Sequence, residues 1–199
     1  MTMGCGASSN SRTCADQEFE AAKAKFPAKE VAGEEVKLGM GTAEKEFDTI
    51  KSFTWTLGGT GSVKIGQVQN VTLNKCPKIQ LEIEECTGVF KSDNLPNGNV
   101  TIKKANILYL HDTCETNIKV DECNVLIILK DGNSTEYTLG KGMVVSIDHG
   151  NITLNKGPEV VLKSYDPTTD SLLEGEDAAK EFTNDRHQGG AKLNNIEAS

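Results

Sequence analysis

The twelve residues "NVTLNKCPKIQL" (70–81) introduce a pattern that returns three times along the chain. "NVTIKKANILYL" begins at Asn99, "NIKVDECNVLII" at Asn117 and "NITLNKGPEVVL" at Asn151. Counted from each Asn as zero, positions +1, +3, +9 and +11 are aliphatic in all four phrases. Positions +2 and +4 are Thr, Asn, Lys or Asp. This alternation predicts strands that each bury one face.

A small residue separates the two halves of each phrase. It falls at position +6 and is Cys76, Ala105, Cys123 or Gly157. A small side chain fits where the backbone bends toward the interior and leaves little room. Each phrase therefore predicts a strand, a corner and a second strand.

Stacking explains why the phrase is repeated. One strand–corner–strand unit cannot bury its apolar face alone, whereas stacked units cover one another. The prediction is an all-β fold, a short right-handed β-solenoid, with a weakly structured or helical lead-in and a polar C-terminal tail. The phrases start 29, 18 and 34 residues apart, with Gly- and Asn-rich loops between them. An antiparallel sandwich is the alternative, although it does not require matching corners.

The domain organisation follows from where this pattern begins and ends. Residues 1–16 are small and polar, and they are predicted to form a lipid-anchor segment. Residues 17–50 are predicted to be a linker with a short helix at "QEFEAAKAKF". The β-helix domain is predicted at 51–165. Residues 166–199 form an acidic tail in which "EGEDAAKEF" predicts one or two helical turns.

Composition narrows the classes of function. Residues 51–165 carry twelve Lys and twelve acidic residues between two acidic flanks, which argues against nucleic-acid binding. The six cysteines form no C-x-x-C pair, so neither a zinc site nor redox chemistry is predicted, and no cofactor is expected. No run of about eighteen apolar residues and no secretory signal are present, so the expected location is cytoplasmic.

Two stretches of the chain resemble a known family. "GSVKIGQVQNVTLNKC" (61–76) and "CETNIKVDECNVLIIL" (114–129) resemble strand pairs in the C-terminal β-helix (CARP) domain of cyclase-associated protein. Tubulin cofactor C-like domains are more distant relatives in this resemblance. Their GTPase activation uses an arginine, because a permanent cation offsets charge at the transferring phosphate. The chain's arginines are Arg12 and Arg186, both in the flanks, so that activity is not expected.

The resemblance implies a binding module of the cytoskeleton that takes an actin monomer in its ADP form. The predicted partner-binding residues are Lys103, Lys119 and Asp121, which fall at outward positions of two phrases. Family domains of this kind also pair through their C-terminal strands, so the resemblance implies a homodimer as well. The alternative is a cytoskeletal or ciliary scaffold that binds tubulin or a small GTPase without activating it.

The N-terminal sequence "MTMGCGASS" contains an acylation pattern. If translation starts at Met3, the chain reads Met-Gly-x-x-x-Ser, with Gly4 as the myristoylation site and Cys5 beside it for palmitoylation. Two acyl chains hold a protein stably at a membrane surface. If Met1 is used instead, Gly4 is internal and nothing is acylated.

Catalytic constellations are not evident in the sequence. His111, His149 and His187 are far apart and are expected at the surface. Cys76 and Cys123 fall at buried corners, where a thiol lacks the nearby base that a nucleophile needs. The sequence therefore predicts no catalytic residue and no enzyme activity.

Overall fold

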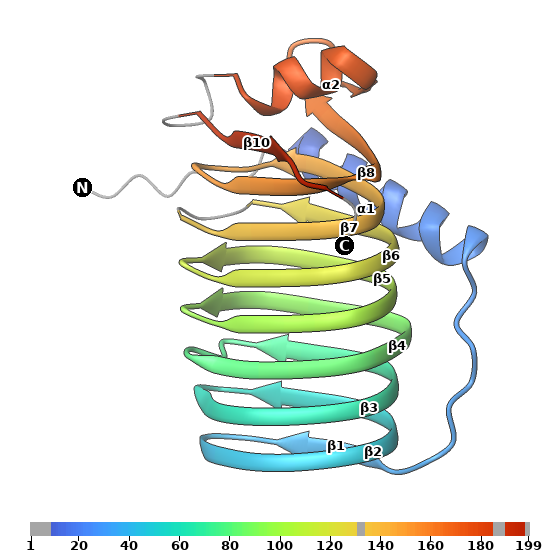
Figure 1. Ribbon diagram of the computed structural model, residues 1–199, viewed down its shortest axis with the longest axis vertical. Helices are drawn as coiled ribbons and strands as arrows, with labels where there is room; N and C mark the ends of the chain where they lie inside the picture. Colours follow the sequence, from blue (N-terminus) through green and yellow to red (C-terminus); the bar gives the residue numbers. More distant parts are fainter. Residues whose placement is uncertain (1–8, 131–133, 185–189, 198–199) are drawn as a thin grey trace.

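The computed structural model describes residues 9–130, 134–184 and 190–197, and it is a β-solenoid of about seven coils (Figure 1). Each long strand bends around one coil and lies beside the next strand in chain order. The stacked strands are β1 (Glu35–Leu38), β2 (Gly41–Thr56), β3 (Gly59–Asn74), β4 (Ile79–Pro96), β5 (Asn99–Cys114), β6 (Asn117–Leu129), β7 (Glu136–Asp148) and β8 (Thr153–Asp166). All these neighbours pair in parallel, which confirms the solenoid and excludes the antiparallel sandwich.

Each coil takes about eighteen residues, the spacing that the register of β5 and β6 sets. Ala105 pairs with Cys123, and Leu108 pairs with Leu126. The phrases that begin at Asn99 and Asn117 therefore stack residue on residue, as the repeat predicted.

The phrase at 70–81 does not stack in that register. Val71 pairs with Phe90, and Phe90 pairs with Leu108, so this phrase begins in the second half of a coil and ends in the next coil. Its central residue, Cys76, lies at the opposite turn of the coil, where its thiol donates to the carbonyl of Trp55 at 3.1 Å.

The phrase that begins at Asn151 is displaced by two residues. Leu154 pairs with Tyr137, which pairs with Ile118. Side chains alternate along nearly the whole coil, so a twelve-residue pattern of alternation fits it at more than one place. The repeat was right about stacking but wrong about which phrases are equivalent.

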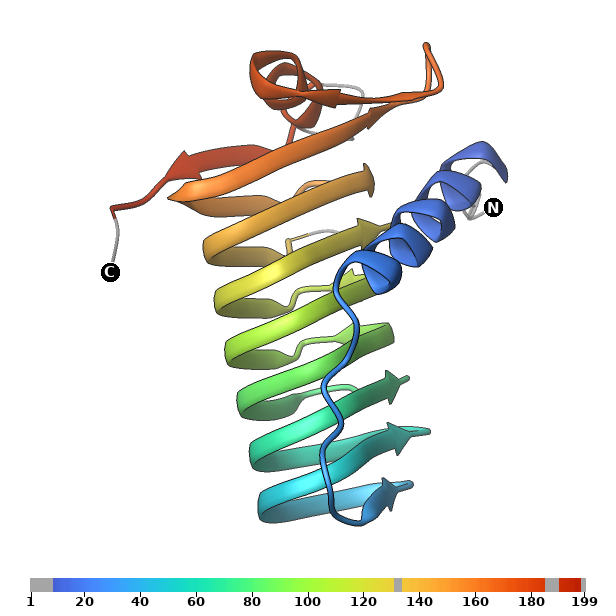
Figure 2. The same ribbon diagram turned by 90° about the vertical axis from the view of Figure 1, so that its right-hand side faces the viewer.

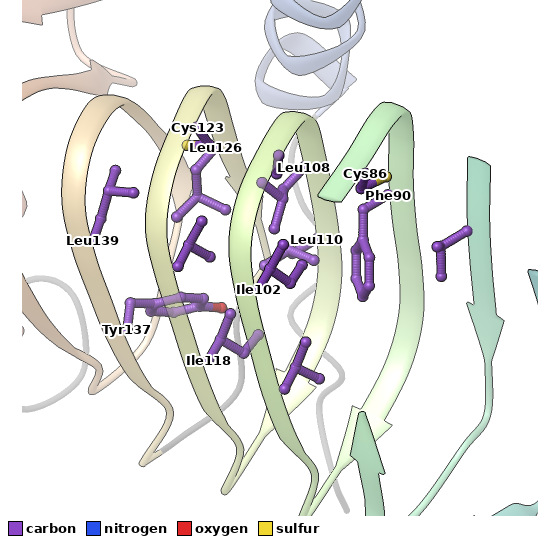
Figure 3. Close-up of a cluster of buried hydrophobic side chains, with 14 of the residues drawn as sticks. Cys86, Phe90, Ile102, Leu108, Leu110, Ile118, Cys123, Leu126, Tyr137 and Leu139 are labelled. Atoms are coloured by element: carbon purple, nitrogen blue, oxygen red, sulfur yellow. The ribbon is translucent and has the colours of Figure 1, made fainter. Parts of the chain in front are cut away.

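The interior is filled by rows of like side chains that run along the stack (Figure 3). Leu108 and Leu126 lie in one such row and Ile102 and Val120 in another, and all four are almost completely buried. A side chain of this size contributes roughly 1.5–3 kcal/mol when it is fully buried. Aromatic rings enlarge the rows at a few places, as Phe90 does.

The turns at the ends of β3, β4, β5 and β6 use the same backbone conformation. Each has two non-glycine residues with positive φ, between 48° and 62°. The recurrent positions are Lys75, Asn94, Asp112 and Lys130, and then Lys78, Asn97, Glu115 and Ser134. Backbone hydrogen bonds join one turn to the next, such as Asp112 N–H to Lys130 C=O at 2.8 Å. Turns of similar backbone conformation let these successive coils stay in register.

Helix α1 (Ser9–Lys25) lies against the outside of the solenoid, and the chain then runs down to the first coil (Figure 2). The helix covers an apolar outer surface on β5, β6 and β7 that includes Ile107, Ile127 and Val145. The strands begin at Glu35, so the predicted boundary at residue 51 was wrong. The first coil is polar because it lies at the end of the stack, and its alternation is therefore weak.

The segment after β8 forms a cap instead of the predicted acidic tail. It contains β9 (Ser171–Glu174), α2 (Gly175–Phe182) and β10 (Lys192–Asn195). The predicted helix at "EGEDAAKEF" is confirmed. β9 and β10 both pair with β8, and Ala178 and Phe182 of α2 are fully buried over the last coil. A cap of this kind shields the end of a solenoid from water.

Candidate functional site

Charged side chains project from the first halves of successive coils. We define the charged face as Lys64, Glu82, Glu84, Lys103, Lys119 and Asp121. Each of these residues directly follows a core residue of β3, β4, β5 or β6, so the alternation of a strand turns it outward. The rigid interior behind them fixes their spacing along the stack.

Ion pairs link neighbouring coils on this face. Lys103 Nζ lies 2.6 Å from Glu84 Oε2, and Lys64 Nζ lies 3.2 Å from Glu82 Oε2. The hydrogen bond to Glu84 and its charge raise the pKa of Lys103. Each of these side chains is more than half exposed. A protein partner could therefore reach the charges without disturbing the core.

The predicted partner-binding residues all lie on the charged face. Lys103 is on β5, and Lys119 and Asp121 are on the adjacent strand β6. Lys119 Nζ and Asp121 Oδ1 are 4.0 Å apart. The structure brings the three side chains together on one exposed surface, and their role in binding stays a prediction.

The predicted lipidation residues, Gly4 and Cys5, lie outside the described residues. Neither described helix is long and apolar enough to cross a membrane. Membrane attachment through this segment therefore stays a prediction.

Burial of three cysteines favours the protonated thiol. Cys76 and Cys123 are buried, as predicted, and so is Cys86, although Cys76 lies at a turn and not at the predicted corner. Burial raises the pKa of both Cys86 and Cys123 to about 12. A thiol reacts as a nucleophile through its thiolate, and a raised pKa disfavours that form in these two side chains. In the described ranges, no group of three or more His, Cys, Asp or Glu could hold a metal ion.

A serine and a histidine lie at hydrogen-bond distance near the C-terminal cap. Ser146 Oγ is 2.7 Å from His149 Nδ1, and His149 Nε2 is 2.8 Å from the carbonyl oxygen of Phe182. The imidazole also stacks on the Phe182 ring at 4.5 Å. His149 is buried, contrary to its expected surface position. Because a carbonyl can only accept, Nε2 carries a proton, and the ring holds α2 on the last coil.

His111, unlike His149, is only partly buried. Its Nδ1 lies 2.7 Å from Asp93 Oδ1, across neighbouring coils on the outside of the solenoid. The expected surface position is confirmed for this histidine, whereas His187 lies outside the described residues.

Sequence reasoning missed a groove between the chain after α1 and the corners of β4, β5 and β6. It encloses about 430 Å³, with Lys25, Lys29 and Lys104 among its lining residues. Asn106 donates to the Phe26 carbonyl at 2.9 Å and to the Thr87 carbonyl at 3.2 Å. These bonds fasten the connecting chain to the solenoid.

A sequence signal for this groove exists in the corner residues. Asn106 and Asn124 are eighteen residues apart and follow the corner residues Ala105 and Cys123 directly. Asn124 donates to Asn106 Oδ1 at 2.9 Å. A repeated amide after a small corner could have indicated that something polar lies over that edge.

Comparisons with known proteins identify no relative: no protein-family model, curated protein or solved structure matches this chain.

Proposed function

We propose that this chain is a non-catalytic protein-binding module whose charged face receives the partner. The observation that supports this proposal is the row of exposed lysine–carboxylate pairs on consecutive coils. An exposed ion pair contributes only about 0–1 kcal/mol to folding. Complementary charges instead govern which surface can approach and how fast it associates.

The partner proposed first is the actin monomer in its ADP form. The support is the resemblance of residues 61–76 and 114–129 to the β-helix domain of cyclase-associated protein. Acylation at Gly4 and Cys5 would tether such a module to the cytoplasmic face of a membrane. The alternative partners are tubulin and a small GTPase.

The homodimer implied by the resemblance faces an obstacle in this chain. β10 pairs with β8 over Thr153 to Lys156, and β9 pairs with β8 over Lys163 to Asp166. Both pairings occupy the last coil from within the same chain. A dimer formed through this edge would have to displace them.

The test is binding of the full chain to fluorescently labelled monomeric ADP-actin and ATP-actin, with tubulin and GTP-loaded small GTPases as parallel arms. The proposal predicts micromolar or tighter binding that favours ADP-actin. Binding to tubulin or a GTPase alone would replace actin with the alternative partner. No binding in any arm would contradict both assignments.

A further inference from the structure

The first coil of the solenoid is covered along only part of its length. β1 pairs with residues 52–55 of β2, whereas residues 41–47 pair with β3 alone among the described strands (Figure 1). We call residues 41–48 the open edge. A strand with one unpaired side presents backbone N–H and C=O groups to which another strand can bond.

Apolar side chains lie beside the open edge. Ala43 and Phe47 of β2, with Val36 and Leu38 of β1, pack against the core while remaining partly exposed. Met40, which precedes the edge, is 84% exposed. At the other end of the solenoid α2 shields the equivalent core residues. The end of the core beside the open edge therefore has no such cap in the described part of the chain.

The charges on the open edge follow the alternation of the strand. Glu44, Glu46 and Asp48 share one side of β2 and are exposed. No ion pair involves them within the described part of the chain. Lys45 pairs with the fully buried Val63, so it stands in a core row, yet it is exposed. An added strand would meet three carboxylates outside and one ammonium group between Ala43 and Phe47.

We propose that the open edge binds an extended basic segment of a partner protein, which adds to β2 as a further strand. Its outward side chains would be Lys or Arg against Glu44, Glu46 and Asp48, and its inward side chains would be apolar. An inward acid would face Lys45. Strand addition of this type draws affinity from backbone hydrogen bonds and specificity from alternate side chains.

A second copy of this chain fits the edge poorly. Pairing two open edges would place the acids Glu44, Glu46 and Asp48 beside the same acids of the other copy. It would also bring the two Lys45 side chains toward each other in the core rows. Like charges opposite one another on paired strands are destabilising. The edge therefore suits a basic segment from another protein.

The probe is a labelled peptide, Lys-Val-Lys-Glu-Lys-Val-Lys, whose binding to the full chain is followed by fluorescence anisotropy. The proposal predicts binding that weakens with salt and falls at least tenfold in Glu44→Lys/Glu46→Lys. The matched control is Glu82→Lys/Glu84→Lys, which makes the same change at the same spacing on β4 and should bind as the parent does. Failure of the peptide to bind, or equal loss in both double variants, would overturn the proposal.

Backbone pairing is tested separately with N-methylated peptides. Methylating the valine and glutamate amides blocks one edge of the peptide, and methylating the lysine amides blocks the other. Only one of these two peptides should lose binding, because one edge faces β2. Equal binding by both would contradict strand addition. Sedimentation of the chain alone should show that two copies do not associate through this edge. If the chain sediments as a dimer and Glu44→Lys/Glu46→Lys abolishes that dimer, the edge would bind a second copy instead.

This docking site does not rest on the proposed function. Glu46 of the open edge lies beside Lys64 of the charged face, whereas Lys103 and Lys119 lie on coils further along the stack. Glu44→Lys/Glu46→Lys should therefore leave partner binding through Lys103 and Lys119 unchanged, and failure of either proposal can be recognised without the other.

Discussion

At the scale of single residues, Gly142 marks a place where two coils come too close for a side chain. A Cβ atom there would lie 1.8 Å from the carbonyl oxygen of Cys123, and φ is +133°. We expect Gly142→Ala to lower the free energy of unfolding by about 1–3 kcal/mol or more, because both the clash and the backbone conformation oppose an alanine at this position. Urea unfolding measures the change.

Gly41 provides a matched control for this substitution. Its φ is +117°, but a Cβ atom there would meet nothing within 4 Å. Gly41→Ala should therefore cost only the backbone strain. Equal destabilisation by the two alanines would show that close approach of the coils does not limit position 142.

Tyr109 couples α1 to the solenoid in a pH-dependent way. Burial raises its pKa to about 12, with further contributions from the charge of Asp16 and the hydrogen bond to it. Because the pKa is higher in the folded chain than in the unfolded chain, the protonated tyrosine stabilises the fold. This stabilisation is complete below about pH 10, the ordinary tyrosine pKa, and is lost as the pH rises through about 12. The free energy of unfolding should therefore fall across this interval.

The measurement combines urea unfolding with titration of tyrosinate absorbance. In Tyr109→Phe the fall in stability between pH 10 and pH 12 should be smaller, and one late-ionising tyrosine should disappear. Tyr165, with a pKa also raised to about 12, should remain in that variant. If the tyrosine lost in Tyr109→Phe were instead one that ionises near the ordinary pKa, the raised pKa of Tyr109 would be contradicted.

At the scale of elements, the docking of α1 explains an irregularity in the sequence. The stretches "ILYL" (107–110) and "VLIIL" (125–129) are continuous apolar runs. The register positions of Tyr109 and Ile127 are occupied by the polar residues Thr72 and Lys91 in the two earlier coils. Ile107 and Ile127 point outward and are buried under α1, so both faces of these strands are covered. Strands buried on both faces lose alternation. The helix itself could be predicted, and this run could have indicated that something covers the strands.

The connecting chain after α1 depends on Asn106. Its side chain donates to the Phe26 and Thr87 carbonyls, and Thr87 Oγ1 donates to the Lys29 carbonyl at 2.7 Å. Asn106→Ala should make residues 26–34 a faster site of proteolysis, because a hydrogen-bonded anchor is removed. Asn155→Ala, which removes a partly exposed amide on β8, is the control. Equal cleavage in both variants would exclude Asn106 as the anchor.

The candidate site could be predicted only in part, for a physical reason. Alternation placed Lys103, Lys119 and Asp121 outward, and the structure agrees. The groove and the open edge depend on contacts between segments far apart in sequence, and local alternation does not contain that information. The repeat also left the register ambiguous, because residues 70–81 match the pattern while occupying another part of the coil.

At the scale of the whole molecule, the two ends of the solenoid differ. The last coil is capped by α2, and the first relies on Lys45, an exposed charge in a core row. Inward charges of this type protect sheet edges from pairing with strands that offer no opposite charge at that position, including a second copy of this chain. We expect Lys45→Val to increase end-to-end self-association, measured by sedimentation at several concentrations. The control is Lys51→Val, at an exposed position of β2 outside the core rows, which should remain as monomeric as the parent. Equal self-association of the Lys45→Val and Lys51→Val variants would exclude Lys45 as the protecting charge.

The most direct measurement of the central claim compares two charge reversals in actin binding. Lys103→Glu/Lys119→Glu changes the charged face, and Lys75→Glu/Lys78→Glu makes the same change at exposed turn residues elsewhere. With labelled monomeric ADP-actin, we predict at least tenfold weaker binding for the first pair and parent-like binding for the second. Parent-like binding by both pairs, or no binding by the parent chain, would contradict the assignment of the charged face as an actin-binding surface.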